Sequence, residues 1–154
     1  MIKISYSASL LAILTFTCLH MQAQTDETAV KQVINNLFTG MKQSDTAMIR
    51  AAFSGAPILQ TIARSREGQT MVRTEPIDSF LVSISHPHTE TYDERISFGT
   101  IKIDGDLAIV WTPYKFYLGD TFSHCGVNSF QLVRLNNQWK IQYLIDTRRR
   151  QGCD

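Results

Sequence analysis

The fold is decided between residues 101 and 147, where the chain reads IKIDGDLAIVWTPYKFYLGDTFSHCGVNSFQLVRLNNQWKIQYLIDT. Runs that are rich in β-branched and aromatic residues are typical of strands. Two turn signals divide the stretch. Asp104-Gly105 is a strong two-residue hairpin signal, and Asn136-Asn137 is expected to turn the last hairpin. The stretch therefore predicts long antiparallel strands.

The two turns also predict which residues lie opposite each other. The first hairpin is expected to pair Ile101 with Ala108 and Gly99 with Val110, with Phe98, Leu107, Ile109 and Trp111 on the other face. The last hairpin is expected to pair Leu132 with Ile141, Phe130 with Tyr143 and Asn128 with Ile145. Both faces of the sheet are then apolar and need a cover. We expect helices on one face and a second copy of the chain, as a homodimer, on the other.

Segments with helical periodicity precede these strands. In the first, apolar residues recur at spacings of three and four, at Ala29, Val30, Val33, Ile34, Leu37, Phe38 and Met41, with Thr25 as its cap. Further elements are expected as a helix over Thr46–Phe53 that Gly55 and Pro57 end, a hairpin of Ile58–Ala63 with Thr70–Thr74, and a helix from Pro76 that stops before Pro87. The sequence thus predicts an α+β fold in the order α-α-β-β-α-β-β-β-β, with a curved antiparallel sheet wrapped around the helices.

The first 23 residues are predicted to be a signal peptide. Lys3 supplies a positive charge, Leu10–Leu19 is mostly apolar, and small and polar residues follow at Gln22-Ala23-Gln24. The apolar run is shorter than the roughly 20 residues that a membrane span needs. We expect cleavage after Ala23 or Gln24, export to the periplasm or medium, and one mature domain over 24–154. A lipoprotein anchored at Cys18 is the alternative.

The charge balance argues against nucleic acid as a partner, and the cysteine content predicts a disulfide. The chain has 15 Lys and Arg against 14 Asp and Glu, so no large basic field exists for nucleic acid. The run Arg148–Arg150 is interpreted as a solvated tail. Export would leave two cysteines, Cys125 and Cys153, for which a disulfide is expected, and two unpaired thiols are the alternative.

The chain resembles the exported branch labelled "putative lumazine-binding" of the nuclear transport factor 2-like (SnoaL-like, cystatin-like α+β) superfamily. The segments that carry the resemblance are Phe53–Gln60, Val72–Glu75, Phe80-Leu81, Tyr92–Ile96, Phe116–Asp120, Ser123–Phe130, Asp146–Arg149 and Gly152-Cys153. The resemblance implies a cone-shaped sheet folded around helices, a pocket at the open end and frequent dimerisation. It implies no activity, since relatives include isomerases, dehydratases, cyclases and binding proteins.

Several kinds of site are not indicated by the sequence. It contains no P-loop, GxGxxG, GxSxG or HExxH motif, and no cofactor is expected. His86-Pro87-His88 lacks a third ligand nearby, so no metal site is expected. Asp93-Glu94-Arg95 is interpreted as part of a charge lattice that pairs with Arg148 or Arg149 across the sheet.

Two acid–base candidates remain. His124 is expected to share a face with Asn128 and Tyr143 near the pocket mouth, and a partly buried histidine bonded to backbone is the favoured alternative. Asp146 is expected on the opposite face, together with Arg148. A desolvated aspartate abstracts protons in relatives of this fold, but an arginine two residues on would hold it ionised, which favours a structural ion pair.

The leading hypothesis is a protein that binds a small apolar or aromatic molecule in the cone. The residues expected to line the pocket are Tyr114, His124, Asn128 and Tyr143. The alternative is a cofactor-free isomerase, dehydratase or cyclase that uses His124 or Asp146. A third possibility is a cone filled by side chains, with the protein acting through its surface.

Overall fold

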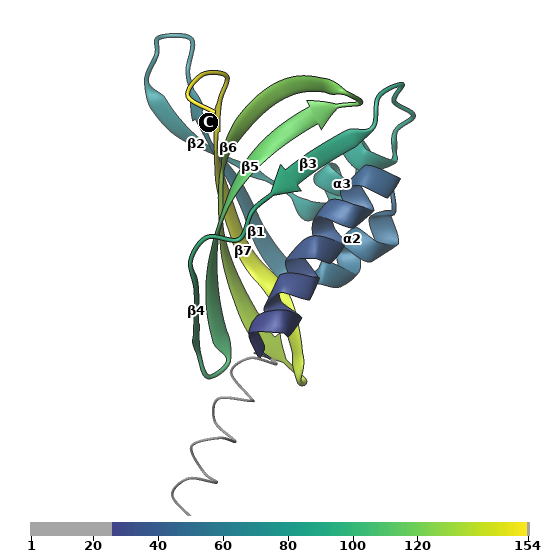
Figure 1. Cartoon of the computed structure of the whole chain (residues 1–154), viewed down its shortest axis with the longest axis vertical. Helices are drawn as coiled ribbons and strands as arrows, with labels where there is room; N and C mark the ends of the chain where they lie inside the picture. The colour runs from purple at the N-terminus through teal and green to yellow at the C-terminus, as the bar shows by residue number, and fades with distance from the viewer. Residues whose placement is uncertain (1–25, 154) are drawn as a thin grey trace, which may run out of the picture.

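The computed structural model describes residues 26–153 and consists of a curved sheet with helices packed against one face (Figure 1). A first helix over residues 26–43 leads to α2 (Thr46–Ala52), β1 (Phe53–Arg64), β2 (Thr70–Glu75), α3 (Ile77–Ser85), β3 (Tyr92–Ile96), β4 (Ile101–Asp104), β5 (Leu107–Leu118), β6 (Thr121–Leu135) and β7 (Gln138–Arg149). The α+β prediction is confirmed. The predicted signal peptide and the predicted cap Thr25 lie outside the described residues.

An aspartate at the start of each of the two N-terminal helices accepts a hydrogen bond that stabilises that end of the helix. Asp26, in the first turn of the first helix, accepts a hydrogen bond from Arg134 of β6 at 2.7 Å. The helix ends at Ser44, whose φ of 55° is left-handed. The next residue, Asp45, caps α2 by accepting from the backbone N–H of Met48 at 2.9 Å. These contacts stabilise the starts of the two helices that precede the first strand in the chain.

The chain enters the sheet earlier than predicted. Phe53 begins β1 instead of closing α2, and β1 continues through Gly55 and Pro57, which were expected to end the helix and precede the strand. The register of β1 against β7 shifts between Phe53 and Ile58. Proline is tolerated at such an irregularity because no ladder hydrogen bond needs its missing N–H. The start of α3 after Pro76 and its end before Pro87 are as predicted.

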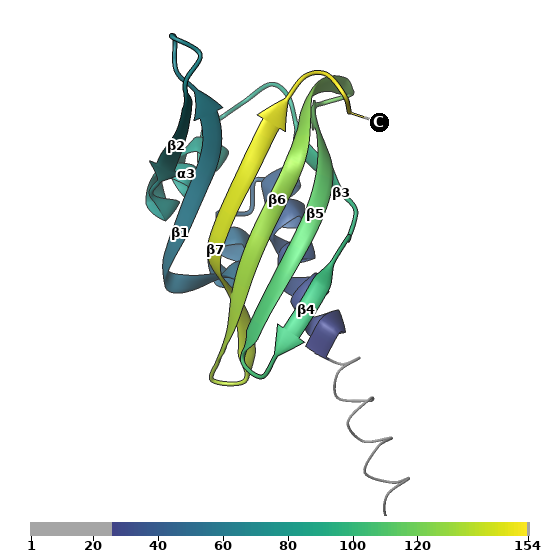
Figure 2. The same cartoon turned by 90° about the vertical axis from the view of Figure 1, so that its left-hand side faces the viewer.

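The strand order is β2-β1-β7-β6-β5-β3, and β4 also pairs with β5 (Figure 2). All neighbours are antiparallel except β1 and β7, which are parallel. The predicted curved antiparallel sheet is therefore confirmed, with this one parallel pair as an exception. Five strands follow α3 where four were expected, because residues 97–100 interrupt one strand and leave β3 and β4 as separate partners of β5.

The two predicted hairpins form, and each differs from the prediction in register. Both Asn136 and Asn137 have positive φ, as a two-residue turn between Leu135 and Gln138 requires. In the other hairpin Gly105 occupies the first turn position, with a φ of 55°, and Asp104 lies opposite Leu107. Ile101 therefore lies opposite Val110, two residues away from its predicted partner Ala108.

A β-bulge at Gln142 changes the last ladder. Leu132 lies opposite Ile141 as predicted, but Gln131 lies opposite Tyr143, so that Gln142 has no partner across the ladder. The predicted pairs Phe130–Tyr143 and Asn128–Ile145 are wrong, and the observed pairs are Phe130–Leu144 and Asn128–Asp146. A slip of one residue moves side chains to the other face of a sheet. Asp146 and Arg148 consequently lie on the face that Asn128 shares, opposite to the prediction.

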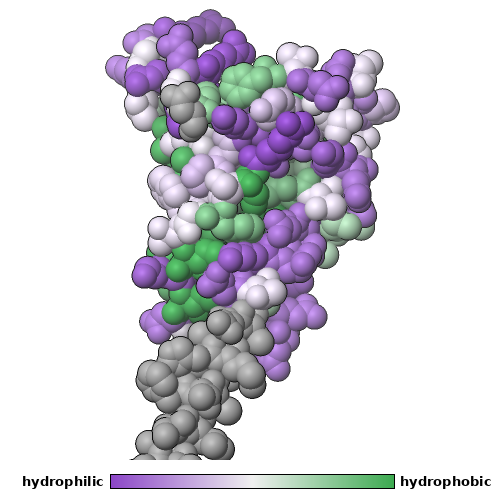
Figure 3. All heavy atoms as spheres, in the orientation of Figure 1, coloured by the Kyte–Doolittle hydropathy of each residue, from purple (hydrophilic) through white to green (hydrophobic). Residues whose placement is uncertain are grey.

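The core lies between the helices and the face of the sheet that they cover, which we call the inner face. Its fully buried side chains include Ile34 and Leu37 from the first helix, Ile49 from α2, and Phe130, Leu132 and Ile141 from the sheet. The other face, the outer face, exposes Leu107, Ile109 and Trp111 by 45–49%. Figure 3 shows an apolar cluster on this side over β4 and β5, bordered by hydrophilic residues.

Cys125 and Cys153 form a disulfide, as predicted. The bond joins β6 to the segment that follows β7 and bridges 28 positions of sequence. Within residues 26–153, the structure contains no helix that is long and apolar enough to cross a membrane.

Candidate functional site

A cavity of about 210 Å³ lies between the first helix, the β1–β2 hairpin and the inner face of β6 and β7. We call it the inner cavity. Its apolar walls are Leu37, Phe38, Met41, Leu59, Pro76, Phe80 and Leu144. Its polar lining is Gln60, Thr61, Arg73, Thr74, Glu75, Glu94, Asn128, Asp146 and Arg148. A concave, mostly apolar site with a few convergent polar groups is the usual form of a small-molecule site.

The polar floor of the cavity follows from the register of the sheet. Arg73, Thr61, Asp146, Asn128 and Thr112 lie directly opposite one another across β2, β1, β7, β6 and β5. Residues in such a row share a face, so all five side chains project inward. Five consecutive strands therefore contribute one polar residue each to the same level of the inner face.

Two carboxylates meet at this floor. Glu94 of β3 accepts a hydrogen bond from the Asn128 side-chain amide at 2.8 Å. Asp146 accepts hydrogen bonds from the Tyr114 hydroxyl at 3.0 Å and from Arg148 Nε at 2.8 Å. Burial, reinforced by the charge of Asp146, raises the pKa of Glu94 to about 7. Glu94 is thus poised to exchange a proton near neutral pH.

Gly126 makes this arrangement possible. It lies opposite Arg148 in the ladder, and an added Cβ would be 1.8 Å from the backbone oxygen of Thr147 and 2.8 Å from the ring of Tyr114. The Thr147 oxygen accepts a second hydrogen bond from the Tyr114 hydroxyl, at 2.9 Å. A side chain at position 126 would separate the phenol from both of its acceptors.

The structure brings some of the predicted site residues together and separates others. Asn128 and Asp146 line the inner cavity, and Tyr114 stands behind them as the hydrogen-bond donor to Asp146. Tyr143 lies on the outer face opposite Gln131, and its hydroxyl donates to Gln60 Oε1 at 2.7 Å. The predicted sharing of one face by His124 and Tyr143 is wrong, because the bulge at Gln142 intervenes.

His124 lies beside the site without lining the cavity. Its ring packs at 4.9 Å from that of Phe116 and at 5.8 Å from that of Tyr114, and its Nδ1 is 3.1 Å from the Ser123 hydroxyl. Burial, together with the charge of Arg148, lowers the pKa of the His124 imidazole, which is therefore neutral at pH 7. These contacts are those of a partly buried histidine within an aromatic cluster.

The sequence analysis missed Glu94 as a site residue. It was grouped with its neighbours in a charge lattice, but alternation along β3 sends Glu94 inward while Asp93 and Arg95 share the other face. There Asp93 pairs with Arg95 at 2.8 Å and with Lys42 at 3.2 Å. Strand alternation is the signal that could have separated Glu94 from the other two. No group of three potential ligand residues within 26–153 could hold a metal ion.

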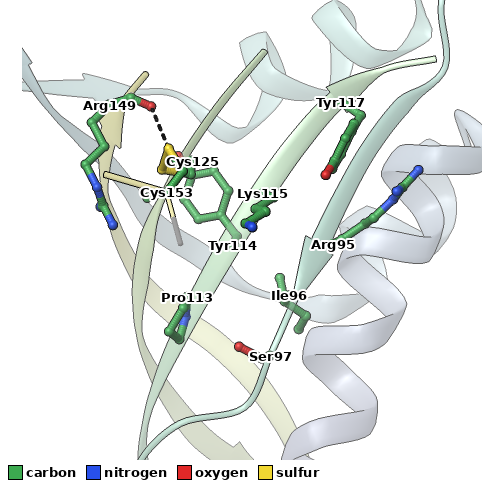
Figure 4. Close-up of a pocket in the computed structure, with 11 residues that line it drawn as sticks. Arg95, Ile96, Ser97, Pro113, Tyr114, Lys115, Tyr117, Cys125, Arg149 and Cys153 are labelled. Carbon is green, nitrogen blue, oxygen red and sulfur yellow. Dashed lines mark hydrogen bonds between the residues drawn. A yellow bond between two sulfur atoms is a disulfide. The ribbon is translucent and has the colours of Figure 1, made fainter. Parts of the chain in front are cut away.

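An open groove of about 230 Å³ lies on the other side of the sheet, beside the disulfide (Figure 4). Arg95, Lys115, Cys125 and Arg149 form a row across β3, β5, β6 and β7 at this groove. Arg95 is already bound to Asp93, and its guanidinium lies 4.0 Å from the centre of the Tyr117 ring. None of the buried, unpartnered polar atoms in the described part of the chain lines this groove. The inner cavity is therefore the better candidate site.

The comparisons with known structures agree with this architecture. A nuclear transport factor 2-like protein with a cystatin-like fold from Novosphingobium aromaticivorans has a TM-score of 0.72 at 10% identity, over 88% of this chain and 89% of that one. A Mycobacterium tuberculosis protein of unknown function has a TM-score of 0.70 at 13% identity, over 86% and 77%. A Streptomyces avermitilis protein of the same superfamily, described as a "putative dehydratase", has a TM-score of 0.60 at 14% identity, over 82% and 98%. At these identities the likeness shows the fold alone.

No curated protein is significantly similar to the chain in sequence. The family model described as "Putative lumazine-binding" matches residues 25–143, which include both N-terminal helices and the strands as far as the first half of β7. The match covers most of the chain and agrees with the curved sheet and its inner helices. The chain therefore belongs to the family described as "Putative lumazine-binding".

Proposed function

We propose that this protein binds a small, largely apolar or aromatic molecule in the inner cavity. The observation that carries the proposal is the combination of an apolar wall with a convergent polar floor. Phe38, Leu59 and Phe80 offer contact area to a flat ligand, and Glu94 and Asn128 offer hydrogen-bonding groups at its edge.

One polar atom of the floor is available for a ligand. The hydroxyl of Thr61 is buried and has no hydrogen-bond partner within residues 26–153. A buried polar group without a partner costs about 1–3 kcal/mol. A ligand that carries a donor or acceptor at this level of the cavity would recover that cost, which supports a polar edge on an otherwise apolar ligand.

The family description suggests one concrete probe. Lumazine is flat and aromatic and carries N–H and C=O groups along one edge, which match a floor of carboxyl, amide and hydroxyl groups. Isothermal titration of the protein with lumazine tests the proposal. Asn128→Ala should weaken binding about tenfold, which corresponds to one or two lost hydrogen bonds.

The matched control is Gln131→Ala, on the same strand but on the outer face. It should leave the affinity for lumazine unchanged, with thermal melts used to confirm that both variants fold. Equal affinities of the two variants, or no binding of lumazine or of other bicyclic aromatics at millimolar concentration, would contradict the proposal.

A second candidate function rests on Glu94. Its carboxyl lines the cavity, and its pKa of about 7 suits a general acid or base at neutral pH. In a cofactor-free isomerase or dehydratase it would take this role in place of His124 and Asp146. Turnover of a carbonyl substrate that is lost in Glu94→Gln, with a pH–rate profile that bends near pH 7, supports the enzyme. Unchanged turnover in Glu94→Gln would contradict the role of Glu94 as the general acid or base.

Dimerisation through the outer face is part of the proposal. Leu107, Ile109 and Trp111 are about half exposed on alternate positions of β5, and an apolar sheet face of this kind is typical of an interface. Light scattering should give twice the monomer mass, and Trp111→Glu should give the monomer mass. A monomeric parent protein at working concentration contradicts this part.

Export is proposed from the sequence of the first 23 residues, together with the disulfide. The measurement is the intact mass and N-terminal sequence of the protein recovered from the cell envelope. A processed N-terminus after Ala23 or Gln24 is the expected result. An unprocessed chain that stays in the cytoplasm would contradict the proposed export.

A further inference from the structure

Figure 2 shows the β1–β2 hairpin diverging from the end of β7. A further hollow, of about 530 Å³, is lined by residues of these strands. We call it the arginine fork, after Arg64, Arg73 and Arg148. Its other lining residues are Thr61, Ile62, Ala63, Thr70 and Thr147. No acidic residue is among the described residues that line it, although the protein as a whole carries almost balanced charge.

The arginine fork adjoins the inner cavity. Thr61, Arg73 and Arg148 line both spaces. Thr61 lies directly opposite Arg73 on β2, and opposite Asp146 on β7. A molecule seated in the inner cavity can therefore extend past these three residues into the fork, and the unpartnered hydroxyl of Thr61 lies at this boundary.

The guanidinium groups of the fork have hydrogen-bonding capacity to spare. Arg73 has no hydrogen-bond or ion-pair partner among residues 26–153. Arg64 donates only to the backbone oxygen of Gly68, at 2.9 Å. Arg148 uses Nε for Asp146, so its two terminal nitrogens remain free of described partners. Arg73 and Arg148 reach the fork from the face of Thr61, and Arg64 reaches it from the other face of β1. Cations around one hollow whose donors are not consumed internally form a site suited to an anion.

The carboxyl groups that line the two joined spaces are Glu94 and Asp146 on the cavity floor and the exposed Glu75 near Pro76. Arg148 pairs with Asp146, and burial raises the pKa of Glu94 to about 7, so that its carboxyl is mostly uncharged below that pH. The carboxyl groups on the floor of the inner cavity are therefore uncharged or paired, whereas the arginine fork carries positive charge that is not paired. Such a distribution orients an amphipathic ligand with its ring inward and its charge outward.

We infer that the natural ligand is an amphipathic anion, an aromatic or apolar body bearing a carboxylate or phosphate group that binds the arginine fork. The inference rests on the proposed binding function of the inner cavity and narrows its ligand to acidic molecules. Bidentate guanidinium contacts to a carboxylate or phosphate supply the affinity and the orientation.

The test compares two probes of the same shape, 2-naphthoate and its neutral analogue 2-naphthamide, by isothermal titration at pH 6, where Glu94 is mostly uncharged. The parent protein should bind the naphthoate about tenfold more tightly or better, as charge-assisted hydrogen bonds predict. Raising the salt concentration should weaken naphthoate binding and leave naphthamide binding unchanged. The double variant Arg64→Gln/Arg73→Gln should remove the preference while retaining naphthamide affinity.

The control for charge alone is Arg50→Gln, an exposed arginine of α2 away from the fork, which should keep the preference intact. Equal binding of the two probes by the parent protein overturns the inference and leaves the proposed cavity function standing. A naphthoate preference that survives Arg64→Gln/Arg73→Gln also overturns it. Failure of both probes to bind overturns the inference together with the proposed function.

Discussion

Asp146 lies directly opposite Asn128 in the β6–β7 ladder, and the two side chains reach different partners on the same inner face. Asn128 donates to Glu94, and Asp146 accepts from Tyr114 and Arg148. One ladder position thus links the edge strand β3 to the end of β7. The floor of the inner cavity depends on this pairing.

Glu94→Gln should change how stability depends on pH. In the folded protein the pKa of Glu94 is raised to about 7 from its ordinary 4.5, so folding takes up a proton between these values. The favourable contribution is complete below pH 4.5 and is lost as the pH rises to about 7, by up to about 3 kcal/mol. Urea unfolding should therefore show that Glu94→Gln is more stable than the parent at pH 8 and similar to it at pH 4.5. A parallel pH dependence of the two proteins would contradict the assignment.

Gly126→Ala should be strongly destabilising. The added Cβ would meet the Thr147 backbone oxygen at 1.8 Å, which neither strand can relieve without breaking the ladder. Overpacking of this kind costs about 1–3 kcal/mol, and more where backbone must move. The matched control is Gly55→Ala, whose Cβ would have no atom within 4 Å. Thermal melts should separate the two variants clearly, and equal melting temperatures would refute the close approach.

Tyr114→Phe should lower the free energy of unfolding by about 1–3 kcal/mol, because it removes the donor to two buried acceptors, Asp146 and the Thr147 oxygen. Tyr117→Phe is the control, since its hydroxyl has no hydrogen-bond partner in the described part of the chain. Its effect should stay within about 0.5 kcal/mol. Chemical denaturation of both variants gives the comparison, and similar losses would mean that the phenol has no special role.

Cys153→Ser should lower stability by about 3–4 kcal/mol, as the chain-entropy model gives for a loop of this length. The parent protein under reducing conditions should match the variant, and the variant should be insensitive to reductant. If reduction leaves the parent's denaturation midpoint unchanged, the bond contributes nothing to stability in solution.

Most of the fold could be predicted from the sequence, because local signals determine it. Helical periodicity over residues 29–41, proline at the start of α3 and paired asparagines at a turn each act within a few residues of chain. The disulfide followed from the count of cysteines outside the predicted signal peptide. These elements were found because propensity and tertiary packing agree there.

The candidate site could be predicted only in part, because it depends on register. Asn128, a predicted pocket residue, lines the inner cavity, but a single bulged residue, Gln142, exchanged the faces of Tyr143 and Asp146. Nothing local in the sequence marks Gln142 as a bulge. Glu94 acquires its importance from burial beside Asp146, which comes from a strand more than fifty residues later. Such long-range pairings are not visible in the periodicity of one segment.

The parallel pair of β1 with β7 has a consequence for how the protein is made. The β1–β2 hairpin joins the other described strands of the sheet only through β7, so neither the inner cavity nor the arginine fork can form until β7 has been synthesised. Contacts between sequence-distant segments form slowly, and the apolar side of the first helix must meanwhile remain uncovered. A nascent chain halted before residue 138 should therefore be a preferred client for chaperones, with binding competence acquired in the final step of assembly.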